Sequence, residues 1–92
     1  MRIYIAGKIT GIENEAVLKF KRAETILKGM GYEPVNPLIE NTTDTWENYM
    51  KLGISKLLTC DGIYMLSNWM NSKGAKIEHN LAEILKLKII YE

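Results

Sequence analysis

Glu78 is the residue whose type and position are most typical of a chemical site. It lies three residues before Leu81 and four before Ala82, in a segment whose apolar residues recur at helical spacing. We therefore expect its carboxylate to lie on the inward face of a helix, where an unpaired charge is costly. Either this carboxylate serves a ligand, or it curls out to water or pairs with Lys8 or Lys73.

The other candidate binding residues lie in three segments that follow predicted strands. The first segment is G-K-I-T-G, whose glycines permit close approach to the backbone, although it is neither a dinucleotide fingerprint nor a P-loop. The second runs from Asn36 and Pro37 toward Asp44, and the third is N-W-M-N-S-K-G at residues 68–74. In the third, Ser72 caps the next helix or helps its N–H groups to bind an anion. The expected ligand contacts are Gly7, Lys8, Thr10, Gly11, Asn36, Trp69, Ser72 and Gly74.

Aromatic residues and one histidine complete the set of candidates. Trp46 and Trp69 are either walls on which a base stacks or core residues, and burial is the favoured interpretation for Trp46. Tyr4 lies in a strand that is buried on both faces, so its hydroxyl needs a partner. His79 points about 100° away from Glu78 around the helix and is expected at the surface.

A scaffold for these residues follows from the alternation of strand-like and helix-like segments. Short apolar runs predict strands at 2–6, 32–36, 62–67 and 87–91. Helical spacing of apolar residues predicts helices at 14–30, 44–59 and 74–86. The expected fold is a three-layer α/β domain of flavodoxin or Rossmann type, with a parallel sheet in the order 2-1-3-4. Ligands bind such sheets at the carboxyl ends of the strands.

Local signals in the middle of the chain add three expectations. Asp44, with Glu47 three residues later, predicts a capping box at the start of the second helix. Gly53, inside that helix, costs on the order of 1 kcal/mol relative to alanine, so another reason for it is expected. Pro34 favours an edge position for the second strand, because proline has no N–H to donate.

The composition predicts one globular domain over residues 1–92, with 47% apolar and 25% charged residues. A net charge of +1 from scattered lysines argues against a nucleic-acid polymer as partner, and no apolar run reaches the ~20 residues of a membrane span. The single Cys60 excludes an internal disulfide. We expect a cytoplasmic protein without cofactor or metal. Because so small a domain buries only roughly 60–65% of its unfolded surface, a homo-oligomer is also expected.

An ordered set of motifs resembles a known family. The set is YIAGKITG at the start, V-N-P after the second strand, W-x-x-Y-M in the second helix, C-D before the third strand and W-x-x-S-x-G-A-x-x-E before the third helix. It is similar to DUF4406, a family common in phages and prophages and placed with the nucleoside 2-deoxyribosyltransferase superfamily. The resemblance spans nearly the whole chain.

This resemblance implies a nucleoside or nucleotide ligand and a covalent mechanism. Glu78 matches the glutamate that attacks C1′ of a deoxynucleoside, and Tyr4 matches a tyrosine near that nucleophile. Ser72 and Gly74 match the S-x-G-x-x-x-E motif of nucleotide hydrolase relatives. The relatives complete their sites across a subunit interface, so the resemblance also implies a homo-oligomer.

The sequence departs from the family pattern at one position. The relatives carry an aspartate eight residues before Asp61, where this chain has Gly53. Substitutes for that acid are Glu40, Asp44, Glu47 or a residue of a neighbouring subunit. Three readings stay open: an N-glycosidase or deoxyribosyltransferase, a module that binds or sequesters a nucleotide without catalysis, and a structural scaffold.

Overall fold

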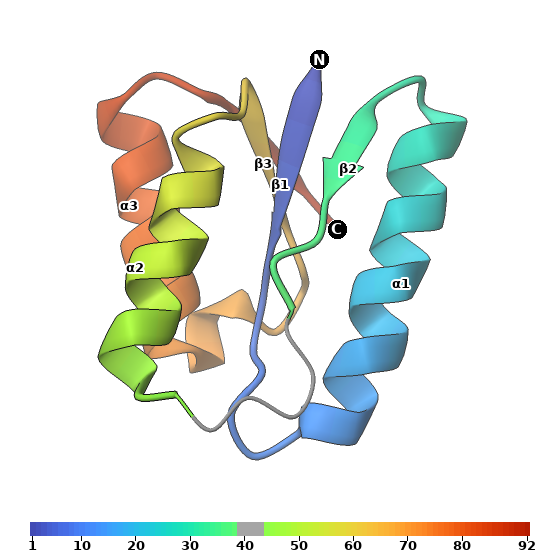
Figure 1. Cartoon of the computed structure of the whole chain (residues 1–92). Coiled ribbons are helices and arrows are strands. Elements are labelled where there is room, and N and C mark those ends of the chain that lie inside the picture. Colours follow the sequence, from blue (N-terminus) through green and yellow to red (C-terminus); the bar gives the residue numbers. More distant parts are fainter. Residues whose placement is uncertain (39–43) are drawn as a thin grey trace.

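A computed structural model describes residues 1–38 and 44–92 and confirms the predicted α/β fold. Within these residues, four parallel strands form one sheet in the order β2-β1-β3-β4. The strands are β1 (Arg2–Ala6), β2 (Glu33–Val35), β3 (Gly62–Met65) and β4 (Lys88–Tyr91). Helix α1 (Glu13–Gly29) covers one face of the sheet, and α2 (Trp46–Leu57) and α3 (Lys73–Ile84) cover the other (Figure 1).

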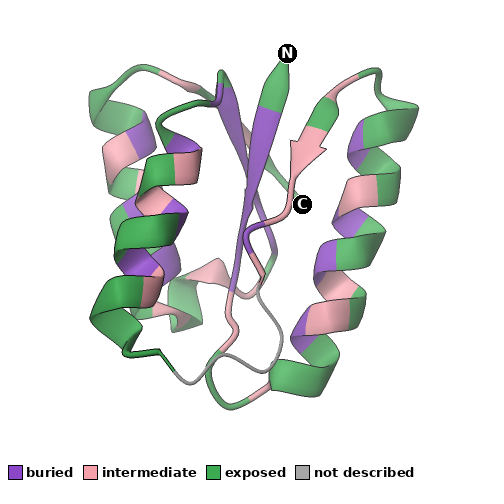
Figure 2. Cartoon of the chain, in the orientation of Figure 1, coloured by how far each residue is buried: buried purple, intermediate pink, exposed green. Residues whose placement is uncertain are grey.

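Alternation along β1 divides its side chains between the two faces of the sheet. Ile3 and Ile5 pack in the cluster that contains Phe20 of α1, whereas Tyr4 and Ala6 pack in the cluster that contains residues of α2 and α3. Most of the buried residues lie in the central strands β1 and β3 and on the inward faces of the helices (Figure 2). Tyr4 is therefore placed on the face that α3 covers.

The helix ends follow local chemistry. The chain leaves α1 through Gly31, whose φ of 86° is the left-handed conformation that glycine adopts without strain. Helix α2 begins at Trp46, and the hydroxyl oxygen of Thr45 accepts a hydrogen bond from the Asn48 N–H at 3.1 Å. The capping box predicted from Asp44 is therefore wrong. The backbone of Thr45 is extended, and this conformation places the Thr45 hydroxyl oxygen over the first turn of α2.

Three strands, β2, β3 and β4, are shorter than predicted, and the loop before α3 contains a turn of 3-10 helix, η1 (Trp69–Asn71). The edge position expected for the strand containing Pro34 is confirmed, since β2 pairs with β1 alone within the described sheet. In the part of the chain that the structure describes, no helix has the length and apolar character needed to cross a membrane.

Candidate functional site

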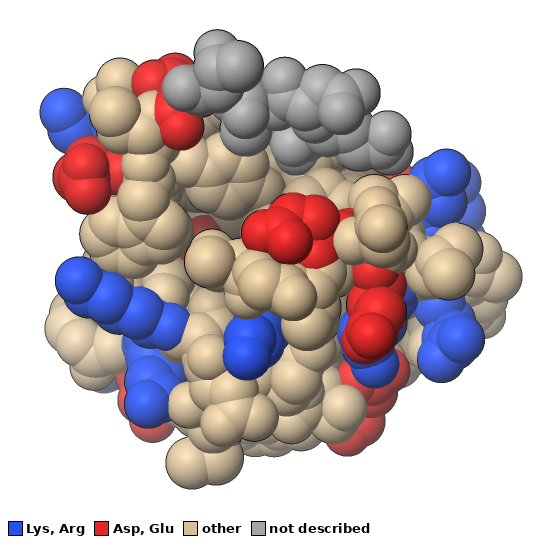
Figure 3. Space-filling model, turned by 90° about the horizontal axis from the view of Figure 1, so that it is seen from below, with Lys and Arg blue, Asp and Glu red and all other residues tan. Residues whose placement is uncertain are grey.

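A cavity of about 550 Å³ opens at the carboxyl ends of the strands. Its walls come from β1 and the loop that follows it, the start of α1, and the facing sides of α2 and α3. Figure 3 looks onto this end of the molecule and shows it hollowed, with acidic and basic side chains around the hollow. The volume lies in the range of small-molecule binding sites.

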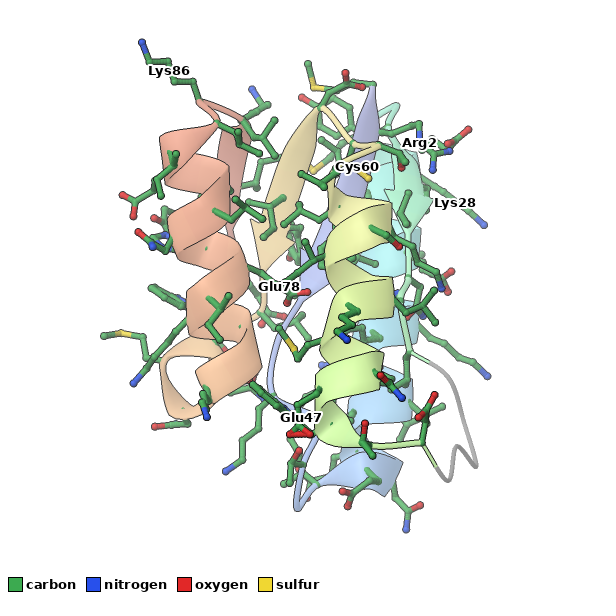
Figure 4. The ribbon with its side chains drawn as sticks, turned by 60° about the vertical axis from the view of Figure 1, so that its left-hand side comes forward. Arg2, Lys28, Glu47, Cys60, Glu78 and Lys86 are labelled. Carbon is green, nitrogen blue, oxygen red and sulfur yellow. The ribbon has the colours of Figure 1, made fainter. Side chains whose placement is uncertain are left out.

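Glu78 lies in this cavity and is paired with Tyr4. The carboxylate comes from the second turn of α3, is only 6% exposed, and accepts a hydrogen bond on Oε2 from the Tyr4 hydroxyl. Figure 4 shows Glu78 reaching from α3 toward α2 and the sheet. Glu78 Oε1 has no hydrogen-bond partner among the described residues. Every fully buried side-chain oxygen or nitrogen in these residues has a partner, so Oε1 is not fully buried. Oε1 is therefore the oxygen that opens to the cavity.

The protonation of this pair follows from its surroundings. Burial raises the pKa of Glu78 to about 7, against the opposing effect of the hydrogen bond from Tyr4. Burial, and then the nearby Glu78 carboxylate, raise the pKa of the Tyr4 hydroxyl far above its usual range. Tyr4 is thus a neutral donor at every physiological pH. Glu78 is divided between its charged and protonated forms near pH 7.

Gly53 is the part of α2 that touches this pair. A Cβ at position 53 would lie 2.8 Å from the Tyr4 hydroxyl oxygen and 3.2 Å from Glu78 Oε2. This close approach explains why a glycine stands inside helix α2, where glycine is otherwise unfavourable. The aspartate expected from the family pattern would collide with Tyr4 in this arrangement.

Two further carboxylates line the cavity, Asp44 and Glu13. Asp44 was a predicted substitute acid. Glu13 was not predicted, although its place two residues after Gly11, in the first turn of the helix that follows the first loop, was a usable signal. Glu47 does not line the cavity, and Figure 4 shows it at the N-terminal end of α2, far from Glu78. Glu40 lies outside the described residues.

Both additional carboxylates are held in the ionised form. The Gly11 N–H donates to Glu13 at 2.9 Å, and this bond is the main cause that lowers the pKa of Glu13. Hydrogen bonds from the Asn48 side chain and the Thr45 N–H lower the pKa of Asp44. At neutral pH these groups can accept hydrogen bonds from hydroxyls, but they hold no proton to give to a leaving group.

A second hollow of about 330 Å³ adjoins the first and has the opposite charge. Lys8 and Lys73 line it, together with Asn71, and it shares four residues with the first cavity: Thr10, Trp46, Ser72 and Gly74. The first cavity has no lysine or arginine in its described lining. A ligand that spans both would therefore place its anionic part in the second hollow.

The structure brings most of the predicted site residues together. Gly7, Thr10, Ser72 and Gly74 line the first cavity beside Tyr4 and Glu78, and Lys8 lines the second hollow. Three predicted ligand contacts line neither hollow: Gly11, Asn36 and Trp69. The Asn36 side chain instead accepts a hydrogen bond from the Leu38 N–H at 3.0 Å.

Two side chains lie where the sequence did not place them. Trp46, expected to be buried, is 38% exposed because it begins α2 at the cavity mouth, where the Lys73 ammonium lies 4.7 Å from its ring centre. His79, expected at the surface, stacks on Trp69 with a centroid distance of 4.2 Å. It also hydrogen-bonds the Tyr91 hydroxyl at 2.7 Å, because β4 ends beside it.

A comparison with protein families identifies the family of this chain. The family model described as a domain of unknown function (DUF4406) matches residues 1–91. The chain belongs to this family. The resemblance drawn from the motifs is thereby confirmed, while no curated protein sequence matches this DUF4406 chain.

Solved structures share the fold of this DUF4406 chain at low sequence identity. A 2-deoxyribosyltransferase from Bacillus psychrosaccharolyticus has a TM-score of 0.73 at 19% identity, over 99% of this chain and 71% of that enzyme. A 2-deoxyribosyltransferase from Leishmania mexicana has a TM-score of 0.75 at 20% identity, over 98% and 62%. A CMP N-glycosidase from Clostridium botulinum has a TM-score of 0.66 at 19% identity, over 99% and 67%. The chain thus spans roughly two thirds of each neighbour and shares its fold.

Proposed function

We propose that the first cavity binds a nucleoside or nucleotide and that Glu78 cleaves its N-glycosidic bond. The observation that carries this proposal is a buried carboxylate on the cavity wall, with Oε2 held by Tyr4 and Oε1 open. A carboxylate in this setting is the nucleophile of retaining glycoside cleavage. The fold, shared with two 2-deoxyribosyltransferases and a CMP N-glycosidase, supports the same chemistry.

The reaction proceeds in two steps. Glu78 Oε1 attacks C1′ of the sugar, the C1′–N bond breaks, and its electron pair leaves with the base, which takes a proton from water. The hydroxide that remains hydrolyses the glycosyl ester and restores the carboxylate. In a transfer, a second base attacks C1′ instead and gives its N–H proton to that hydroxide.

The site residues then have separate roles. Tyr4 fixes the nucleophile, and Glu13 and Asp44 accept hydrogen bonds from sugar hydroxyls or from the base. Lys8, Lys73 and the N–H groups at the start of α3 receive a 5′-phosphate in the second hollow. Only ionised Glu78 attacks, so the rate rises with pH through about 7.

A second candidate function is binding without catalysis. It is favoured by the lowered pKa values of Glu13 and Asp44, which leave no described acid to protonate the departing base. Loss of a general acid costs on the order of 10²–10⁴ in rate. A chain with this deficit would still hold the ligand in the same two hollows.

Release of free base distinguishes the two functions. The protein is incubated at pH 8 with deoxynucleosides and their 5′-monophosphates, and free base is followed by chromatography. We expect release that Glu78→Gln abolishes and that Glu47→Gln, a matched change outside the cavity, leaves intact. Absence of release with a raised thermal midpoint on ligand addition would favour the binding module. Absence of both would overturn both functions.

A further inference from the structure

We propose that Gly53 is a positioning residue. Its missing side chain lets α2 hold the Tyr4 hydroxyl against Glu78, so that Oε2 is fixed and Oε1 is left to the ligand. The contact itself is independent of the activity, and its consequence for catalysis rests on the proposed function.

Tyr4 is a buried residue of the central strand β1, and its hydroxyl lies against α2 at Gly53. Tyr4 is 2% exposed and lies between Val35 of β2 and Ile63 of β3 in the sheet register. A Cβ at position 53 would come within 2.8 Å of its hydroxyl oxygen, a separation that real Cβ atoms essentially never show. Any side chain at position 53 must therefore push Tyr4 off Glu78 or push α2 off the sheet.

The surroundings of Glu78 make this contact decisive for its charge. In the described part of the chain, the Tyr4 hydroxyl is the group that lowers the pKa of Glu78 against burial. Tyr49 of α2 also lines the cavity and donates its own hydroxyl to the Pro37 carbonyl at 3.3 Å. The acids that share the cavity are Glu13 and Asp44, and no lysine or arginine belongs to its described lining. Displacing Tyr4 removes the one neutral donor from the carboxylate.

A double-mutant cycle on stability tests the contact without any ligand. Gly53→Ala should lower the thermal midpoint in the wild-type background. In the Tyr4→Phe background the same change should raise the midpoint, because the added methyl occupies the space of the missing hydroxyl and alanine is the better helix former. Gly29→Ala is the matched control, since a Cβ at that helical glycine meets nothing within 4 Å and should raise the midpoint. If Gly53→Ala raises the wild-type midpoint as Gly29→Ala does, the inference is overturned.

Titration of the Glu78 carboxyl tests positioning as distinct from packing. The signal is followed by NMR on protein labelled with ¹³C at glutamate carboxyls, and its loss in Glu78→Gln assigns it. The pKa of Glu78 should rise in Tyr4→Phe and in Gly53→Ala, with no further rise in the double variant. An unchanged pKa in Gly53→Ala would overturn the inference. Expected results here, together with no base release, would refute the proposed function and leave the positioning role standing.

Discussion

At the scale of single residues, Glu78 is held in a costly state. Burial removes solvent from the carboxylate, and one hydrogen bond from Tyr4 compensates only in part, so its pKa rises to about 7. Structural ion pairs are normally arranged to satisfy a buried charge. A carboxylate left with one oxygen open to a cavity is instead typical of a site that awaits a ligand.

This state predicts an unusual dependence of stability on pH. The unfolded chain loses the Glu78 proton near pH 4.5, whereas the folded chain keeps it to about pH 7, so the folded form binds more protons between those values. The contribution of the Glu78 carboxyl group to the free energy of unfolding is therefore complete below pH 4.5 and is lost as the pH rises through about 7.

Glu78→Gln should remove that dependence and raise the free energy of unfolding at pH 8 by up to about 3 kcal/mol. Urea unfolding at pH 5 and pH 8 measures it. Glu47→Gln, at an exposed position, is the control for the loss of a carboxylate and should not raise the free energy of unfolding at pH 8. A Glu78→Gln variant less stable than wild type at pH 8 would contradict the shifted pKa.

The two lysines of the second hollow predict a preference for anionic ligands. Lys8→Gln and Lys73→Gln should each weaken binding of a nucleoside 5′-monophosphate two- to five-fold, as expected for partly exposed charge pairs. Binding of the uncharged nucleoside should change little. Calorimetric titration at low and high salt measures both, and the difference should shrink at high salt. Equal losses for the two ligands would place the phosphate elsewhere.

At the scale of elements, α2 is the wall that completes the site. It contributes Trp46, Met50 and Gly53 to the cavity, and its start depends on one cap. Thr45→Ala should lower the free energy of unfolding by about 1 kcal/mol, because the Asn48 N–H loses its acceptor.

Chemical denaturation of Thr45→Ala and of Thr25→Ala measures this effect. Thr25 is an exposed threonine of α1 whose hydroxyl donates back to the Lys21 carbonyl, so its replacement by a better helix former should cost nothing. Equal losses in the two variants would mean that the cap does not stabilise α2.

The order of the elements could be predicted because it depends on local patterns. Apolar runs and helical spacing identify the strands and helices, and the rules for parallel sheets then give the order 2-1-3-4. The inward direction of Glu78 followed from its spacing to Leu81 and Ala82 alone.

Side-chain partners from distant segments could not be predicted. His79 is covered because Tyr91, twelve residues further along the chain at the end of β4, lies beside it and hydrogen-bonds its ring. Gly53 is required because the hydroxyl of Tyr4, a residue of β1, lies against α2 at this position. The spacing of residues within α2 cannot predict that contact. Trp46 looked like a core residue by type, yet its place at the first turn of α2 put it at the cavity mouth.

At the scale of the whole molecule, the chain leaves large apolar side chains in contact with water. On α3, Ile77 and Ile84 are 39% and 66% exposed and lie two helical turns apart on one side. Leu85, the C-cap, is 45% exposed. A domain of this size buries only roughly 60–65% of the surface of its unfolded chain, and association would remove this patch from water.

The expected homo-oligomer is therefore testable on α3. Light scattering after gel filtration should give a mass above the 10.5 kDa of one chain, and Ile84→Glu should return it to that value. Lys76→Glu, an exposed change on the same helix, is the control for added negative charge. A wild-type chain of 10.5 kDa at all concentrations would refute association.

The covalent step at Glu78 is the central claim, and mass spectrometry of the digested protein tests it most directly. The protein is mixed with a deoxynucleoside or its 5′-monophosphate at pH 8, quenched in acid during turnover, and digested. The account predicts that the peptide carrying Glu78 gains the mass of one sugar or sugar phosphate less one water, as a glycosyl ester requires, and that Glu78→Gln abolishes both the adduct and base release. Base release that persists unchanged in Glu78→Gln, without an adduct, would contradict it.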